Sequence, residues 1–438
     1  MKGFLYRLIL IAHAAAVAAA CGGVPMKVLA VRGSPIDLGP VPEDVEGEPY
    51  AIAAAGNDLW MLETGKGQLE VRRFSAGGEV GDPEIILKLQ PELWGLGEDV
   101  PGDAILSPDL ADSPPGDLQA CLGPGLEEMG RVIRLYRASL VPVGDGFGVI
   151  FGARAPVRCG DQGIETVASV EHVVVFDAAW NRIQDDRAVW VGDPPLEAVP
   201  VLSGGRLDAA WLAPDGVWVS GAGRPPSREI GFVSRWSPAA MPVHFLVQGP
   251  EGVAAFVLGV VETPMATVGK GDSYLVLHSA HAGDPSSQEV TRTPLPEKPR
   301  AVAAAWTGET LGVAIFAEVV RPHAESNAWV WYAGFDASGE AQGGLVTILE
   351  WKSATGRSFG LSGLDVASDG SSIAAAWLHE GDLGPLVDVA TSDGTAWGEP
   401  ATHDVGWEGA ADPRILPGGD GFLLLWSDTS LRLLVLAP

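Results

Sequence analysis

Short apolar runs, separated by turns rich in glycine and aspartate, recur along most of the chain. Seven segments share one form: a short apolar strand, a turn that contains Gly or Asp, and a second apolar strand that often ends in Trp or Phe. The seven predicted hairpins begin at Tyr50, Leu140, Val199, Val243, Ala301, Leu364 and Pro413. From the second copy on, the second strands end roughly 45 to 61 residues apart, a spacing typical of repeated four-stranded sheets.

The second strand of the sixth hairpin is apolar on both faces. Ile373, Ala375 and Trp377 point to one side of this strand, and Ala374 and Ala376 point to the other. Loss of alternation is the pattern of a strand that is covered on both sides. Sheets that pack face to face around an axis provide such cover, with small residues near the crowded centre and Trp in the wider periphery.

We therefore predict an all-β fold, a single β-propeller of four-stranded blades, most simply seven, with six or eight as alternatives. Only one strand follows the last hairpin before Pro438, so Met26–Gly33 is expected to complete that blade and close the ring. Closure removes the sheet edges that promote aggregation. The predicted division is a signal peptide at 1–20, a tether and closing strand at 21–48, and the propeller at 49–438.

Residues 90–134 interrupt the repeat, because they are rich in Pro, Gly and Asp and predict an irregular excursion. An extra blade in this region is the alternative. Cys121 lies in the excursion, and Cys159 follows the second hairpin. Two remaining cysteines in an exported chain most simply pair, so we expect a Cys121–Cys159 disulfide, with two free buried thiols as the alternative.

A second kind of hairpin follows several of the first kind and predicts the third and fourth strands of a blade. These segments begin at Arg72, Val173, Trp331 and Val387. In the last of them, Thr391–Trp397 resembles a shortened Asp box of sialidase-like propellers. The resemblance implies a structural turn in which the Asp carboxylate accepts hydrogen bonds from turn amides and the aromatic ring packs inward.

The N-terminus has the organisation of an export signal. Lys2 and Arg7 precede an apolar stretch, and small residues lead to Cys21. This end resembles the lipobox of bacterial lipoproteins, which implies cleavage before Cys21 and a diacylglyceryl group on its thiol. Ala18 departs from the larger aliphatic residue usual there, so an ordinary secretory signal cut near Ala20 is the alternative. By the same resemblance, Gly22 favours the outer membrane over inner-membrane retention.

Composition narrows the classes of partner. The formal net charge of −28 repels nucleic acid and anionic lipid head groups, so neither is an expected partner. The membrane is expected to be contacted through the lipid anchor alone. The charge is spread along the chain, which is typical of a solvated surface; a cation-rich partner or diffuse Ca²⁺ binding is the alternative. No cofactor and no metal site are expected.

The longer connections after the second strands form the candidate ligand face, because they leave the propeller on the same side as the links between blades. Their charged and polar residues include Arg154, Arg158, Asp161, Lys270, Asp272, Arg321, His323, Glu325, His379 and Glu380. Taken one by one, these residues are also what ordinary solvated loops contain. The sequence indicates a face and does not name a ligand.

The expected function is that of a non-catalytic, envelope-tethered lipoprotein that binds or scaffolds a protein or glycan. Overall the chain resembles uncharacterised propeller lipoproteins of Gram-negative bacteria. Sialidase activity would need an Arg cluster and a Tyr nucleophile, and the chain has five Tyr and only Arg32 near the place of the family's Arg-Ile-Pro motif. The alternative is a carbohydrate-active enzyme, a glycoside hydrolase or lyase, with carboxylates at the channel mouth.

Lipidation of Cys21 is directly testable. Metabolic labelling with a palmitate analogue should mark the wild-type chain and leave Cys21→Ala unlabelled, because the thiol is the only attachment point that the resemblance implies. Equal labelling of the two chains would refute the lipoprotein prediction.

Overall fold

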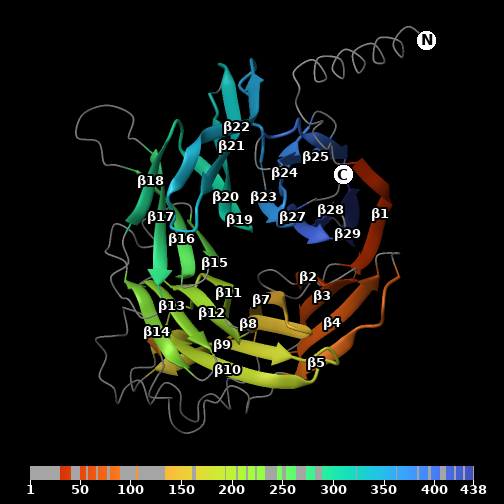
Figure 1. Ribbon diagram of the computed structural model, residues 1–438, viewed down its shortest axis with the longest axis vertical. Coiled ribbons are helices and arrows are strands. Elements are labelled where there is room, and N and C mark those ends of the chain that lie inside the picture. Colours follow the sequence, from red (N-terminus) through yellow and green to blue (C-terminus); the bar gives the residue numbers. More distant parts are fainter. Residues whose placement is uncertain are drawn as a thin grey trace.

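The computed structural model describes most of the chain between residues 30 and 437. Outside this description lie residues 1–29 and 438, the gaps 41–49, 89–104, 107–133, 232–243, 249–252, 263–272 and 282–288, and shorter gaps in other turns. The described residues form seven sheets of β-strands, which lie in a ring around a common centre (Figure 1). The predicted all-β propeller with seven blades is confirmed.

In five blades four consecutive strands run outward in chain order from a first strand near the centre of the ring; in the other two, an earlier strand is added at the outer edge (Figure 1). Blade 1 is formed by β2 (Tyr50–Ala55), β3 (Asp58–Gly65), β4 (Gln68–Ser75) and β5 (Glu84–Lys88). Blade 2 contains β7 (Arg134–Val143), β8 (Gly146–Cys159), β9 (Ile164–Phe176) and β10 (Arg182–Val191). Blade 3 is formed by β11 (Glu197–Ser203), β12 (Arg206–Ala213), β13 (Gly216–Gly221) and β14 (Arg224–Gly231).

Three further blades follow, and the last is completed by the N-terminal strand. Blade 4 is formed by β15 (His244–Gln248), β16 (Val253–Glu262), β17 (Ser273–His281) and β18 (Glu289–Leu295). Blade 5 is formed by β19 (Pro299–Thr307), β20 (Thr310–Val319), β21 (Ser326–Phe335) and β22 (Ala341–Ser353). Blade 6 is formed by β23 (Gly363–Ser368), β24 (Ile373–Glu380), β25 (Pro385–Ser392) and β26 (Ala401–Asp404). Blade 7 is formed by β27 (Ala411–Gly418), β28 (Gly421–Ser427), β29 (Ser430–Ala437) and β1 (Ala30–Pro40).

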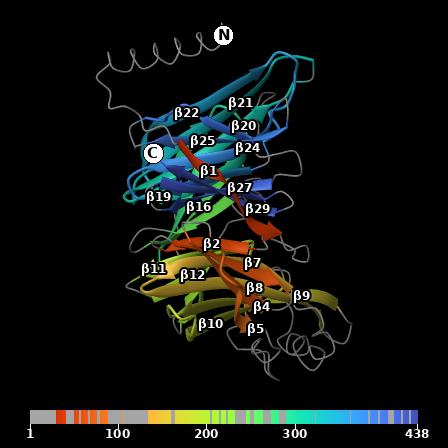
Figure 2. The same ribbon diagram turned by 90° about the vertical axis from the view of Figure 1, so that its right-hand side faces the viewer.

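The ring closes by pairing of the two ends of the described chain. Strand β1 runs antiparallel to β29 as the outermost strand of blade 7, and Arg432 Nη1 lies 2.8 Å from Asp37 Oδ2 across this pair. The closing strand therefore begins inside the predicted segment and continues beyond it to Pro40; residues 26–29 of that segment lie outside the described residues. Figure 2 shows the ring from the side, with β22 toward one end and β10 toward the other.

One short strand has no counterpart in the other blades. Strand β6 (Ile105–Leu106) comes from the predicted excursion and pairs in parallel with Trp190 and Val191 of β10, as a fifth strand of blade 2. The described part of the excursion thus extends an existing blade, and the described strands contain no eighth sheet. The rest of residues 90–134, including Cys121, lies outside the described residues.

Both faces of β24 are buried, as the sequence predicts. Ile373, Ala375 and Trp377 pack toward blade 5, while Ala374 and Ala376 pack toward blade 7. A Cβ atom on Gly312 of β20 would lie 2.3 Å from Cδ1 of Ile373. A side chain at residue 312 would therefore force Ile373 to move.

Aromatic clusters fill the wider space between blades farther from the centre. Between blades 1 and 2, the rings of Phe147 and Trp180 stack with centroids 4.7 Å apart, and Trp60 lies 5.3 Å from each of them. Trp180 belongs to the turn between β9 and β10. Such clusters supply apolar burial and favourable ring geometry together, so the turns between third and fourth strands take part in holding the blades together.

The turn geometry of the Asp-box resemblance occurs in blades 2 and 5. Asp177 Oδ1 accepts hydrogen bonds from the amides of Ala179 and Asn181 at 2.9 and 2.8 Å, and Trp180 packs inward. Asp336 Oδ1 accepts the amide of Ser338 at 2.9 Å in the corresponding turn of blade 5. In the predicted copy, Asp393 lies outside the described residues.

Trp397, the aromatic residue of that predicted copy, packs against Tyr332 of blade 5 with ring centroids 5.1 Å apart. The resemblance therefore holds for the inward aromatic ring of this copy.

Among the described residues, no helix is long and apolar enough to span a membrane.

Enlarging a central alanine should destabilise the propeller. Ala375→Leu adds volume at a residue whose exposed fraction is 0%, on the face of β24 that packs against blade 5, so we expect a loss of about 1–3 kcal/mol in the free energy of unfolding. Denaturant unfolding measures the loss. Val346→Leu on the exposed side of β22 is the control and should leave the midpoint nearly unchanged; equal midpoints for all three chains would contradict the packing.

Candidate functional site

The structure brings together five of the ten predicted ligand-face residues. Arg321, His323 and Glu325 lie in the connection from β20 to β21, and His379 and Glu380 end β24 in the next blade. The other five do not join them in the described structure. Arg154 lies opposite Ser169 in blade 2, Arg158 belongs to β8 with its side chain outside the described set, and Asp161, Lys270 and Asp272 lie in gaps.

Three neighbouring connections form what we call the three-loop platform, defined by the exposed residues Arg321, His323, Glu325, Arg357 and Glu380. They belong to the links β20–β21, β22–β23 and β24–β25 of blades 5 and 6. The middle loop is wedged between the other two, as its glycines show.

Two glycines permit this wedging. A Cβ atom on Gly356, where φ is +72°, would lie 2.6 Å from the carbonyl oxygen of Arg321 and 2.9 Å from the amide nitrogen of His323. A Cβ atom on Gly360 would lie 3.0 Å from Cγ of Glu380. The backbone of the middle loop therefore lies in direct contact with the other two loops. These contacts fix the backbone positions from which the side chains of the platform project.

Hydrogen bonds between the loops add to this base. Arg357 Nη2 donates to the carbonyl oxygen of Gly381 at 3.0 Å, and the amide of Glu380 donates to the carbonyl oxygen of Phe359 at 3.2 Å. Within the first loop, the amide of Arg321 donates to Ser326 Oγ at 3.0 Å. Each loop is thus held by its neighbour or by the strand that it enters.

His323 occupies an uncommon backbone conformation for its residue type. Its φ is 63°, in the left-handed region, and its side chain is exposed. Left-handed conformations of non-glycine residues carry an energetic cost and persist where surrounding contacts impose them. The close approach of Gly356 to the His323 amide is of this kind, so the platform fixes the backbone from which the exposed imidazole projects.

A buried carboxylate lies below the platform and joins blades 5 and 6. The side chain of Glu318 on β20 accepts hydrogen bonds from Ser358 Oγ at 2.8 Å and from the amide of Phe359. Arg300 on β19 forms an ion pair with it, with 3.2 Å between Nη1 and Oε2. Burial of a charge needs such partners, and here two of the partners, Ser358 and Phe359, belong to the middle loop.

His379 supports the platform from beneath. Its ring stacks on Phe359 with centroids 4.4 Å apart and planes at 8°, and its Nε2 atom lies 3.2 Å from Asp388 Oδ2. Asp388 also accepts a hydrogen bond from Thr402 at 2.6 Å. The sequence placed His379 on the ligand face, and in the structure only 11% of its side chain is exposed, so it orders the loop above it.

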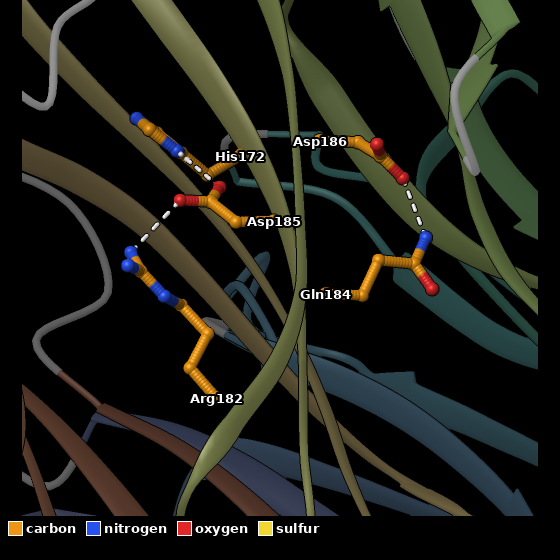
Figure 3. Close-up of polar contacts among 5 residues, drawn as sticks. All are labelled: His172, Arg182, Gln184, Asp185 and Asp186. Carbon is orange, nitrogen blue, oxygen red and sulfur yellow. Dashed lines mark hydrogen bonds and ion pairs between the residues drawn. The ribbon is translucent and has the colours of Figure 1, made fainter.

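A second buried histidine lies in blade 2. His172 Nδ1 and Arg182 Nη1 each lie 3.1 Å from a carboxylate oxygen of Asp185. Figure 3 shows how the three side chains converge. Gln184 and Asp186, the residues on either side of Asp185, contact each other on the other side of β10. Burial lowers the pKa of His172, and its hydrogen bond with Asp185 opposes this shift. This group joins β9 to β10.

Carboxyl groups on two inner strands connect one blade to the next. Asp365 Oδ2 on β23 accepts the amide of Ile415 on β27 at 2.9 Å, and Glu197 Oε2 on β11 accepts the amide of Leu246 on β15 at 2.6 Å. Desolvation raises the pKa of each carboxyl group to about 7. Sequence analysis missed both; an acidic residue inside an apolar strand, as in Leu364-Asp365-Val366, is the signal that marks them.

A buried arginine lies close to Glu197. Arg137 Nη2 on β7 donates at 3.0 Å to both Glu171 Oε1 and the carbonyl oxygen of Pro195. Burial lowers the pKa of Arg137 to about 10 and raises that of Glu171 well above its usual range. Arg137 therefore links blade 2 to the start of blade 3, and this cluster is a connection between blades rather than an open site.

The described residues contain no group of three or more His, Cys, Asp and Glu side chains placed to hold a metal ion. Cys159 is the last residue of β8, but its side chain, like all of Cys121, lies outside the described set. The Cys121–Cys159 disulfide and the lipidation of Cys21 therefore stay predictions.

Comparison with protein-family models and with curated proteins found no match. Among solved structures, the chain is similar to the WD40 domain of Toxoplasma gondii coronin, with a TM-score of 0.47, 9% identity, and coverage of 94% of this chain and 86% of that one. It is also similar to the β-propeller domain of Myceliophteria thermophila Cps50 (Swd1), with a TM-score of 0.43 and 11% identity. This match covers 93% of this chain and 99% of that one. Trypanosoma rangeli sialidase matches with a TM-score of 0.37 and 10% identity, over 93% of this chain and 60% of the sialidase. These solved structures include WD40 and sialidase propellers; the propeller fold of this chain rests on its own seven sheets.

Titration of Asp365 should make stability depend on pH. The folded-state pKa of about 7 exceeds the ordinary value of 3.8, so the folded chain holds this proton more tightly than the unfolded chain. The resulting stability is complete below about pH 4 and is lost as the pH rises through 7. Asp365→Asn should therefore reduce the change in the free energy of unfolding between pH 4 and 8. We expect this change to shrink by roughly 1–3 kcal/mol after allowance for partial solvent contact.

The exposed Asp82→Asn is the control for this measurement and should keep the wild-type pH profile. An Asp365→Asn profile parallel to that of the wild type would show that the carboxyl group titrates at its ordinary pKa.

Proposed function

We propose that this chain is a non-catalytic propeller, tethered to the cell envelope through a lipid on Cys21, that binds a protein or glycan partner at the three-loop platform. The observation that carries the proposal is the platform itself. Exposed cationic, anionic and imidazole side chains project from three loops whose backbones brace each other. Such preorganisation lowers the entropic cost of binding.

The charge distribution supports a partner other than nucleic acid. The chain as a whole carries a net charge of −28, whereas the platform combines Arg321 and Arg357 with Glu325 and Glu380. Mixed charges favour a partner whose own groups are arranged to match, and they raise specificity more than raw affinity. A tether at the outer membrane is part of the same proposal, and the resemblance of Cys21-Gly22 to the start of outer-membrane lipoproteins supports it.

The carbohydrate-active enzyme is the second candidate, and one observation favours it. Glu197 and Asp365 have raised pKa values near 7, the property of a general acid. Each carboxyl group, however, already accepts the backbone amide of the next blade. Their contacts are those of structural ties, and this supports the binding function over the catalytic one.

Site-specific photo-crosslinking in cells tests the proposal. A benzophenone amino acid placed at Arg321 should give a discrete adduct with the partner, because this side chain lies on the platform and is exposed. The same probe at Ile183, on the outer strand of blade 2 with 66% of the residue exposed, is the matched control and should give none. Identical adducts at both positions, or none at Arg321, would overturn the proposal.

A further inference from the structure

One face of β21 carries a row of residues that differs from the rest of the inter-blade surface. Strand alternation places Asn327, Trp329 and Trp331 on the side turned toward blade 4, where both tryptophans pack against a cluster that includes Leu275 of β17. Val330 packs on the opposite side, toward blade 6. The row runs from the buried Trp331 to the polar Asn327, which lies next to the three-loop platform.

The two tryptophans form a stacked pair. Their ring centroids lie 5.7 Å apart with planes at 17°. Trp331 is 4% exposed, whereas Trp329 keeps partial contact with solvent. Trp331 covers one side of Trp329, and Trp329 is the tryptophan of the pair that lies nearer to Asn327 along the strand. A ring that is held from behind is a rigid surface for a ligand.

Charged groups surround this indole in fixed positions. The register of β22 places Glu350 opposite Trp329 and Lys352 opposite Asn327. Lys352 Nζ lies 3.0 Å from Glu350 Oε1, and the Trp329 side chain also donates to Glu350; the pKa of Glu350 is lowered by these hydrogen bonds, that from Lys352 first. Glu325 of the platform adds its charge to raise the pKa of Lys352 further, after the larger effect of Glu350.

Asn327 contributes an acceptor to the same surface. Its Oδ1 atom is buried and, among the residues that the structure describes, has no hydrogen-bond partner. A buried amide oxygen without a partner costs free energy, and a donor from a bound molecule would remove this cost. The atom lies on the face of the strand that carries Trp329, so such a donor would sit beside the indole.

We infer that Trp329, Asn327, Glu350 and Lys352 form a binding site for a neutral pyranose unit of a glycan. A pyranose ring has an apolar C–H face, which fits an indole surface, and a rim of hydroxyl groups that both donate and accept hydrogen bonds. Glu350 and the Asn327 oxygen accept from such hydroxyls, and Lys352 donates to them. Glycan binding here rests on the proposed function and assigns its ligand class.

The charge balance favours a neutral sugar over an anionic ligand. Lys352 is paired with Glu350 and lies within the influence of Glu325, so it has no excess positive charge to offer a phosphate or carboxylate. Among the side chains that the structure describes, few apolar ones accompany Trp329 at the exposed end of this face, whereas a peptide would require a larger apolar anchor area. A small aromatic surface with surrounding polar groups matches a single sugar ring.

The test begins with the full mature chain on an array of neutral oligosaccharides, followed by calorimetric titration of the strongest ligand. Trp329→Leu should weaken binding at least ~10-fold, since it removes the stacking surface. Trp351→Leu, on the neighbouring strand but packed toward blade 6, is the matched control and should bind within about twofold of the wild type. Circular dichroism confirms that each variant is folded.

Glu350→Gln provides a second variant at an exposed position that does not endanger folding. It should weaken binding several-fold, because an amide is a poorer acceptor than a carboxylate. Equal losses in Trp329→Leu and Trp351→Leu, or an array without any bound neutral glycan, would overturn the inference. An empty array combined with a crosslinked protein at Arg321 would overturn the glycan site and leave the proposed function standing.

Discussion

A blade of this propeller has no solvent-facing side near the centre of the ring, because a neighbouring sheet covers each of its faces. Strand β24 illustrates the consequence: its residues alternate between two clusters, one shared with blade 5 and one with blade 7. A fully buried side chain of the size of isoleucine contributes about 1.5–3 kcal/mol. No single sheet could bury this surface alone, so the blades depend on each other and on closure by β1.

This dependence explains why polar groups inside the ring are shared between blades. A carboxyl group on an inner strand is costly unless it finds a donor, and the nearest donor is the exposed amide edge of the next inner strand. Asp365 and Glu197 use this solution near the centre, whereas Glu318 finds its donors in the loop between blades 5 and 6. The same contacts fix the angle between adjacent sheets, so they set the base from which the loops project.

Much of the fold could be predicted because its repeats are local. A hairpin such as Leu364–Trp377 contains its own turn and both of its strands, and all seven hairpins were placed in this way. Strand β6 could not be predicted, because two residues that pair in parallel with a distant strand leave no periodic signal. The sequence predicted turns at Asp177 and Asp336 but not the hydrogen bonds from turn amides to these two carboxylates. Those bonds depend on the backbone geometry of each turn and not on residue spacing.

The candidate site was predictable only in part, and for a related reason. Loop lengths indicated the connection that carries Arg321, His323 and Glu325, but the sequence cannot tell which loops of different blades touch. Arg357 was missed because its loop follows a fourth strand and looks like an ordinary link. Trp329 was missed because a tryptophan in an apolar strand is usually core; only the register with Glu350 and Lys352 shows that one end of this buried face opens onto charged groups. In a propeller the search for function therefore belongs where the shared packing between two blades ends and their loops begin.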